Sequence, residues 1–238
     1  MREHVLGGPR PRPTVWAVVV GAGSGTRFGS FKQFENVRGA SLFSWSIRAL
    51  RDHVDGVVAV VPPAAPAPSD VAEFADVVVS GGASRSESVR AGLAAIPGSA
   101  DWVLIHDAAR PCCAPGVVER VIDALANGRR AVVPTVAVID TIKTMSPSGT
   151  LSTLDRNALR AAQTPQGFVV AELKRAHAAA QAGGGEATDD GAVMEDVGVE
   201  VWSVAGDVDN IKVTTRDDLD KVGVWLDRRA LSTSEETS

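Results

Sequence analysis

The stretch VWAVVVGAGSGTRFGSFKQF, residues 15–34, decides how the rest of the chain is interpreted. It opens with a continuous apolar run, residues 15–20, and then becomes rich in glycine. A short β-branched run that ends in glycines is typical of a buried parallel strand that opens into a loop, and ligands bind at that end of such strands. Glycine lets backbone N–H groups approach an anion, and Arg27 and Lys32 add positive charge. The stretch therefore predicts a cradle for a polyphosphate.

The glycine spacing excludes two common nucleotide-binding motifs. The glycines are Gly21, Gly23 and Gly25, and Thr26 stands where a dinucleotide-binding G-x-G-x-x-G loop has its third glycine. A Walker A loop needs a lysine directly after its last glycine, and no lysine follows a glycine within residues 15–34. On spacing alone, a plain glycine turn with two solvated cations stays open as an alternative.

Composition sets the class of protein and excludes some partners. The chain has 238 residues, 45% hydrophobic and 22% charged, which fits one α/β domain with a large core. Its net charge of −5 argues against nucleic acid as a partner, since such binding needs a basic face. No run approaches the roughly 18 apolar residues of a membrane-spanning helix, so no membrane partner is expected. The adjacent cysteines, Cys112 and Cys113, form no disulfide framework or zinc motif, which favours a reducing cytoplasm.

Apolar patterning predicts strands that alternate with helices almost throughout, and hence an α/β fold with one doubly wound, mostly parallel sheet. The expected strands are 15–20, 57–61, 77–79, 102–106, 131–134 and 199–204. Helices are expected at 41–51, 71–75, 84–96 and 115–126, within 168–182, and at 188–194 and 215–226. Thr188 and Thr215 are the expected caps of the last two helices.

One segment breaks this alternation. Residues 137–153 hold two β-like runs around Pro147-Ser148-Gly149, which predicts a hairpin, and residues 137–157 are expected to leave the body as an arm. The body is a single domain, residues 15–228. A flexible N-terminal arm, 1–14, is expected before it, and a disordered, polar and acidic tail, 229–238, after it.

Seven segments occur in this order along the chain: AGSGTRFGSFKQ, GGASRSESV, HDAARPC, DTIK, DRNALRAAQTPQGF, TDDGAVME and DNIKVTTRDDL. Together they resemble the 2-C-methyl-D-erythritol 4-phosphate cytidylyltransferases of the non-mevalonate isoprenoid pathway, over nearly the whole chain. The resemblance implies a Rossmann-like nucleotidyltransferase fold. It also implies transfer of CMP from CTP to 2-C-methyl-D-erythritol 4-phosphate, by in-line attack on the α-phosphate, giving 4-diphosphocytidyl-2-C-methyl-D-erythritol and pyrophosphate.

The resemblance also implies roles for individual residues. The catalytic residues would be Arg27, Lys32, Lys212 and Arg156. The CTP-binding residues would be Ala22, Gly23, Ser24, Gly25, Gly82, Ala83, Ser88, Asp107 and Ala108. The residues that bind the methylerythritol phosphate would be Arg110, Thr141, Arg156, Thr164, Thr188 and Thr214. Mg²⁺, or another divalent cation, would be held by Asp107 and, as a weaker candidate, by Asp209. In the family the arm reaches the neighbouring subunit's site, so a homodimer with shared sites is implied.

Plainer interpretations stay open for several of these residues. Arg156 by itself is as typical of a surface ion pair, Asp209 of a solvated loop, and Arg85 of a solvated first helical turn. His106 is interpreted as a buried strand residue rather than a base. The cysteines have no sign of a nucleophile's partners.

The chain departs from the family pattern between its first two cations. Only FGSF, residues 28–31, separates Arg27 from Lys32, two residues fewer than usual, and Phe31 replaces a proline. This makes the reach of Lys32 the weakest point of the resemblance. A non-catalytic nucleotide-binding homologue therefore stays open as an alternative. A cytidylyltransferase for another polyol phosphate, such as ribitol 5-phosphate, also stays open, because it would share the CTP site.

Overall fold

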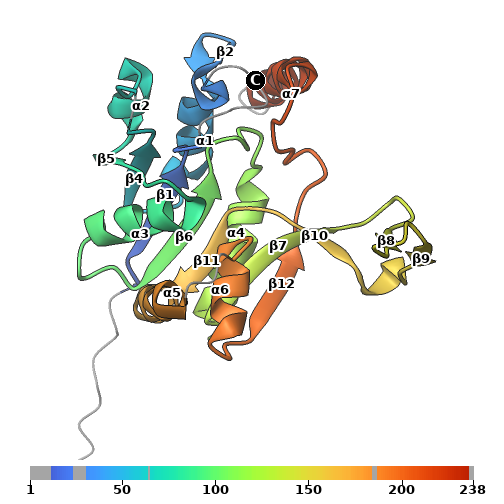
Figure 1. The fold of residues 1–238 in the computed structure, drawn as a ribbon. Helices are drawn as coiled ribbons and strands as arrows, with labels where there is room; N and C mark the ends of the chain where they lie inside the picture. The colour runs from blue at the N-terminus through green and yellow to red at the C-terminus, as the bar shows by residue number, and fades with distance from the viewer. Residues whose placement is uncertain (1–11, 24–30, 64, 184–186, 236–238) are drawn as a thin grey trace, which may run out of the picture.

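The computed structural model describes residues 12–23, 31–63, 65–183 and 187–235. In this part of the chain an eight-stranded sheet runs through the molecule, and helices lie on both of its faces (Figure 1). The sheet consists of β1 (Val15–Val20), β4 (Gly56–Val61), β5 (Val77–Ser80), β6 (Trp102–Asp107), β7 (Ala131–Ala137), β10 (Arg160–Ala162), β11 (Gln166–Val169) and β12 (Val201–Ala205). The helices are α1 (Leu42–Arg51), α2 (Ser69–Phe74), α3 (Arg85–Ala95), α4 (Pro115–Ala126), α5 (Val170–Gly183), α6 (Asp190–Asp196) and α7 (Asp217–Glu235). A short 3-10 helix, η1 (Lys32–Phe34), and the paired strands β2 (Asn36–Val37) and β3 (Ala40–Ser41) precede α1.

The sheet is mixed, with parallel strands at its centre. Its order is β10-β7-β11-β6-β1-β4-β5, and β12 pairs with β7. The central strand β1 is parallel to both of its neighbours, so that Val18 lies opposite Val58 and Ile105. Strand β11 runs antiparallel to β6 and β7, and β10 runs antiparallel to β7. The predicted α/β fold with a mostly parallel sheet is confirmed, but β10 and β11 were missed because RAAQTPQGFV, residues 160–169, holds no continuous apolar run.

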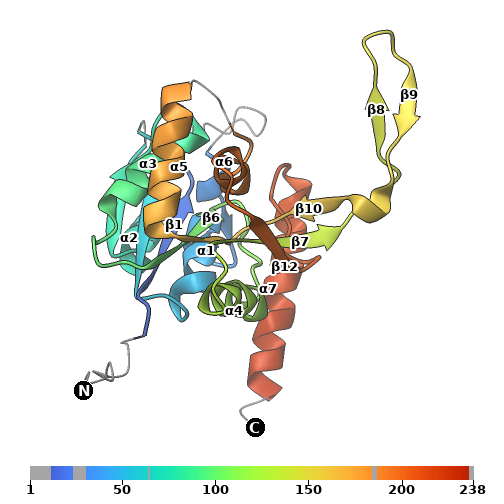
Figure 2. The same ribbon diagram turned by 90° about the horizontal axis from the view of Figure 1, so that it is seen from below.

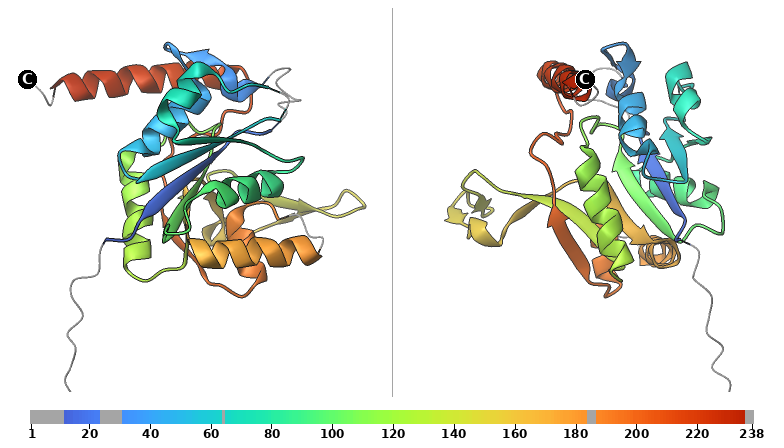
Figure 3. Two further views of the ribbon diagram at one scale, coloured as in Figure 1. Left: turned by 90° about the vertical axis from the view of Figure 1, so that its left-hand side faces the viewer. Right: turned by 180° about the vertical axis from the view of Figure 1, so that it is seen from behind.

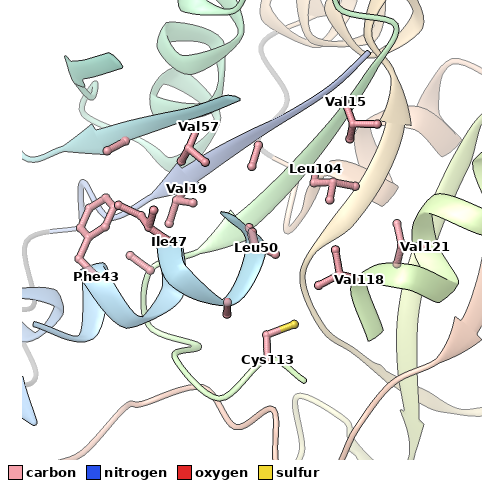
Figure 4. Packing of buried hydrophobic residues seen from close by; sticks show 14 of the residues in the cluster. Val15, Val19, Phe43, Ile47, Leu50, Val57, Leu104, Cys113, Val118 and Val121 are labelled. Carbon is pink, nitrogen blue, oxygen red and sulfur yellow. The ribbon is translucent and has the colours of Figure 1, made fainter. Parts of the chain in front are cut away.

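Two apolar clusters, one on each face, hold the helices to the sheet. Along β1, Ala17 and Val19 face the cluster under α1 and α4, and Val18 faces the cluster under α3, α5 and α6. Figure 4 shows the first of these clusters, where Phe43 and Ile47 of α1 pack against the sheet. Side chains of a strand alternate between faces, so a β-branched run buried on both sides fixes β1 at the centre.

Helix boundaries follow the capping residues. The hydroxyl of Ser41 accepts a hydrogen bond from the N–H of Ser44 at 3.1 Å, and Ser84 caps α3 through the N–H of Glu87 at the same distance. The predicted cap of α6, Thr188, is wrong. The carboxylate of Asp189 accepts from the N–H of Ala192 at 2.9 Å, and a carboxylate also suits the positive end of the helix dipole.

Two segments extend from the body. Strands β8 (Lys143–Met145) and β9 (Leu151–Thr153) pair antiparallel and form a hairpin that stands away from the sheet (Figure 2). Helix α7 runs along one side of the body and continues beyond it (Figure 3). The tail expected to be disordered from residue 229 is thus helical as far as Glu235, and the helix begins at Asp217 rather than Thr215. Of the expected N-terminal arm, residues 1–11 lie outside the described part. Within the described residues, no helix has the length and apolar character needed to cross a membrane.

Candidate active site

A cavity of about 810 Å³ opens where the central parallel strands end. Its floor is the carboxyl end of β1 and β6, at Gly21 and Asp107, and one wall is the loop that leads into α3. The predicted residues that line it are Ala22, Gly23, Lys32, Gly82, Ala83, Ser88, Asp107, Ala108, Lys212 and Thr214. Residues from five separate stretches of the sequence therefore meet at the site that the opening glycine-rich stretch predicted.

The carboxylate of Asp107 lies between two cations. Its Oδ2 is 2.7 Å from the ammonium group of Lys212, and its Oδ1 accepts a longer contact of 3.4 Å from Nε of Arg85. Burial alone would raise the pKa of Asp107, but Arg85 and Lys212 outweigh burial and hold this pKa well below its usual range. Asp107 is therefore ionised at neutral pH, and both of its cationic partners line the same cavity.

A buried hydrogen-bond network fixes Asp107 from behind. Its N–H donates to the hydroxyl of Thr164 at 3.0 Å, and that hydroxyl lies 3.0 Å from Nδ1 of His106. Nε2 of His106 lies 3.0 Å from the carbonyl of Arg110 and must donate to it, so Nδ1 accepts from Thr164. Burial lowers the pKa of His106 to about 4. The imidazole is thus neutral and occupied at both nitrogens, in agreement with its interpretation as a buried strand residue.

The glycine-rich loops at the cavity are braced by neighbouring side chains. The buried amide of Gln33 donates to the carbonyls of Gly21 and Gly23 at 2.6 and 3.2 Å. In the loop that leads into α3, the N–H of Gly82 donates to the hydroxyl of Ser88 at 3.1 Å. The N–H of the next residue, Ala83, donates to the carboxylate of Glu87. These walls of the cavity are therefore a pre-formed surface of backbone and small side chains.

Lys32 reaches the cavity despite the short segment before it. Its ammonium group donates to the carbonyl of Val213 at 2.8 Å, beside Lys212 and Thr214. The backbone of Val213 is in turn held by the carbonyl of Ala109 at 2.8 Å. These contacts bring the two lysines to the same cavity although they are far apart in the sequence. Of the other residues predicted for this loop, Ser24, Gly25 and Arg27 lie outside the described residues.

Other predicted residues lie elsewhere. Thr164 is buried behind Asp107, and Arg110 donates to the carbonyls of Asn210 and Ala162 at 2.7 and 3.3 Å rather than lining the cavity. Thr188 precedes α6 and also lies off the cavity lining. Thr141 and Arg156 are exposed on the projecting segment that carries β8 and β9, where Arg156 donates to the carbonyl of Ile139 at 3.0 Å. One chain therefore does not bring these two residues into its own cavity.

Among the described residues that line the cavity, Asp107 is the one carboxylate. Asp209 instead lines a separate hollow of about 390 Å³ beside Cys112 and α7, which argues against it as a second metal ligand. No group of three or more His, Cys, Asp or Glu residues suited to a metal occurs in the described part of the chain. A single carboxylate still fits Mg²⁺, because that ion is commonly held by one or two carboxylates together with substrate phosphates and water.

Sequence reasoning missed two residues that shape the site, Gln33 and Asp190, and left the role of a third, Arg85, open. Gln33 directly follows Lys32, and its value as a loop brace depends on long-range packing that no local pattern shows. For Arg85 the sequence leaves a site role and a solvated position equally open, and the structure places it on the cavity lining. Asp190 forms an ion pair with Arg85 at 2.8 Å. The signal that could have found it is the second of two adjacent carboxylates in TDDG, residues 188–191.

A mixed sheet whose central parallel strands open into a cavity with glycine-rich walls, cations and one carboxylate defines an α/β nucleotide-binding protein of the nucleotidyltransferase class. The family model described as "IspD: 2-C-methyl-D-erythritol 4-phosphate cytidylyltransferase" matches residues 15–228. The chain belongs to this family, which confirms the resemblance inferred from its motifs.

Individual relatives agree with this assignment. A 2-C-methyl-D-erythritol 4-phosphate cytidylyltransferase of Nocardia farcinica is 42% identical over 229 residues, which cover 91% of this chain and 96% of the relative. A bifunctional enzyme IspD/IspF of Nitratidesulfovibrio vulgaris is 41% identical over 222 residues, and this chain spans 56% of its length. The crystal structure of the cytidylyltransferase from Thermus thermophilus superposes with a TM-score of 0.76 at 36% identity, covering 89% of this chain and 98% of that one.

Proposed function

We propose that the protein transfers the cytidylyl group of CTP to 2-C-methyl-D-erythritol 4-phosphate and releases pyrophosphate. The observation that carries this proposal is that Lys32, Lys212, Arg85 and Asp107 line one cavity at the glycine-rich end of the central strand, with Arg85 and Lys212 paired to Asp107. Membership of the family supports the choice of both substrates.

The proposed reaction requires positioning and charge stabilisation rather than a base. An oxygen of the substrate phosphate forms a bond to the α-phosphorus of CTP, and the bond from that phosphorus to the oxygen bridging to the β-phosphate breaks. The electron pair leaves with pyrophosphate. The attacking phosphate has a second pKa near ~6 and is already anionic at neutral pH, so it has no proton to lose. This agrees with the neutral, fully occupied His106 beneath the site.

The cavity residues divide naturally between these tasks. Lys32 and Lys212, together with Arg27, would stabilise the negative charge that builds up on the triphosphate. The loops at Gly23 and Gly82 would hold the cytosine and ribose, with Ala22, Ser24, Gly25, Ala83, Ser88 and Ala108 around them. Asp107 would hold Mg²⁺ jointly with phosphate oxygens, and the ion would supply further charge neutralisation.

We further propose that the active form is a homodimer in which each hairpin segment completes the partner's site. The support is the apolar surface that this segment leaves exposed: Ile139 is 80% exposed, Met145 74% and Leu151 59%. Isolated hairpins are marginally stable, and exposed apolar patches mark interaction surfaces. Thr141 and Arg156 would reach the methylerythritol phosphate in this way, beside Arg110, Thr164, Thr188 and Thr214 of the other subunit. Light scattering on the eluted protein, with a mass of two chains expected, tests the dimer.

A cytoplasmic location is part of the same proposal. Cys112 and Cys113 are free and buried, and burial raises the pKa of both thiols to about 12. Free, unreactive thiols are what a reducing compartment permits.

The decisive experiment measures pyrophosphate release from the purified protein with CTP and Mg²⁺. Methylerythritol phosphate and ribitol 5-phosphate are offered in parallel. Release with methylerythritol phosphate alone is the expected result. Release only with ribitol phosphate would retain the fold and the reaction type but overturn the substrate. CTP binding without release from either substrate would identify a non-catalytic homologue.

A further inference from the structure

Arg85 connects the cavity to a second, deeply buried carboxylate. It is the first residue of α3, and its Nε contacts Oδ1 of Asp107 at 3.4 Å. Its Nη1 forms an ion pair with Oδ2 of Asp190 at 2.8 Å. The guanidinium group therefore spans two carboxylates that come from β6 and α6.

Asp190 is itself held from the other side. It is fully buried, and its Oδ1 lies 2.9 Å from Nε2 of His177, a residue of α5 that is 2% exposed. A buried charge is costly unless it is paired, so Asp190 stays where His177 and Arg85 hold it. The result is a continuous chain of contacts: His177, Asp190, Arg85 and Asp107, leading from the core to the cavity.

The two cations at Asp107 are restrained very differently. The side chain of Lys212 is 45% exposed and contacts the carboxylate through one flexible ammonium group. The side chain of Arg85 is 28% exposed and is anchored at both Nε and Nη1, while its Nη2 makes no bond within the described residues. An arriving triphosphate can thus draw Lys212 away from Asp107, whereas Arg85 stays in place.

We propose that Asp190 is a positioning residue that holds Arg85 against Asp107, so that Asp107 keeps a cationic partner when Lys212 moves to the bound nucleotide. This role rests on the proposed function of the cavity. It adds two elements to that function. One is a cation, Arg85, whose Nη2 is left for a ligand, and the other is the buried carboxylate of Asp190, which orients Arg85. It also explains why the second carboxylate of TDDG is buried, although it lies off the cavity lining.

The test is a double-mutant cycle on CTP binding, measured by titration calorimetry with CTP and Mg²⁺. Asp190→Asn removes the charge at nearly constant volume, and Arg85→Met removes the guanidinium group but keeps the bulk. Each single variant is expected to weaken CTP binding about tenfold, as loss of an orienting contact does in comparable sites. The double variant should bind within about twofold of Arg85→Met, because Asp190 acts through Arg85.

Asp189→Asn is the matched control. It keeps a side-chain cap for α6, loses the hydrogen bond that Asp189 accepts from Gln166 at 2.7 Å, and has no contact with Arg85. It therefore disturbs the start of α6 without touching Arg85, and its CTP affinity should stay within about twofold of the wild type. Wild-type CTP affinity in Asp190→Asn would overturn the proposal. The proposal would also be overturned if Asp190→Asn weakened CTP binding as much in the Arg85→Met background as in the wild type, because Asp190 would then act only through the fold. If the wild type binds CTP but releases no pyrophosphate, the proposed function fails, and the binding cycle still decides the role of Asp190.

Discussion

The ammonium group of Lys212 lies 2.7 Å from Oδ2 of Asp107, although 105 positions separate the two residues in the chain. The contact forms because the segment after β12 returns to the end of β6, where the N–H of Val213 donates to the carbonyl of Ala109 at 2.8 Å. In this structure the pair neutralises the carboxylate at the floor of the cavity. Under the proposed function, Lys212 would leave Asp107 for a phosphate of the bound nucleotide.

Replacing Lys212 with alanine should lower the rate of pyrophosphate release by about 100-fold or more. Removing one positive group from a site of developing negative charge has an effect of this size. CTP affinity should fall less, because Lys32, Arg85 and the loop backbone remain. Lys221→Ala is the control, since Lys221 pairs with Asp218 at 2.8 Å on α7 and does not line the cavity. Equal losses in both variants would show that Lys212 has no special role.

The buried His106 should make the protein lose stability as the pH falls from about 6.5 toward 4. Burial lowers its folded-state pKa to about 4, whereas the unfolded chain has an ordinary value near 6.5. Between these values the unfolded state binds more protons, so acidification favours unfolding, and at pH 5 the cost is about 2 kcal/mol. Urea unfolding of the wild type and of His106→Gln, at about pH 7 and about pH 5, measures this loss of unfolding free energy.

The His106→Gln variant should lose less stability than the wild type between the two pH values. All other titrating groups are common to both proteins, so their contribution cancels when the two losses are subtracted. His53→Gln, at a partly exposed position, serves as the control and should follow the wild type. Identical pH dependence in His106→Gln and the wild type would mean that His106 is not held neutral by the fold.

The sequence predicted those parts of the fold that local pattern controls. Apolar runs such as residues 15–20 and 57–61 located the central parallel strands, and Pro115 and Ala126 correctly marked the bounds of α4. Strand β11 could not be found in this way. Its Gln166 and Gly167 are buried by tertiary packing, with Gly167 directly under Val121 of α4, and neither residue type signals a strand.

The candidate site was predictable where backbone and charge lie close in sequence, and less so where function depends on packing. The glycine-rich loop and the positive charge of Lys32 followed from their place after a strand, and Asp107 followed from the family resemblance. The bracing of that loop by Gln33 and the anchoring of Arg85 by Asp190 are contacts between distant elements. Residue type alone does not distinguish a solvated Arg85 from one that lines the cavity. The distinction depends on its ion-pair partner, Asp190, which is fully buried.

Gly92 should tolerate no side chain, because α3 packs closely on the sheet at this point. A Cβ atom there would lie 2.3 Å from Cγ1 of Val18 and 3.0 Å from Cγ2 of Val60. Overpacking of this kind typically costs ~1–3 kcal/mol, so Gly92→Ala should lower the free energy of unfolding in urea by that amount. Gly98→Ala is the control, since a Cβ at Gly98 meets nothing within 4 Å. A Gly92→Ala variant as stable as Gly98→Ala would contradict the close packing of α3.

Two inactive variants should restore activity to each other if the hairpin segment completes the partner's site. Lys212 belongs to the cavity and Arg156 to the projecting segment, so Lys212→Ala and Arg156→Ala should each be nearly inactive alone. In a mixed dimer one site carries both defects, and the other combines an intact cavity with an intact hairpin. After equal mixing and refolding, about half of the dimers are mixed, and about a quarter of the wild-type rate should return. If each chain used its own Arg156, every site would keep one defect, and mixing would restore nothing.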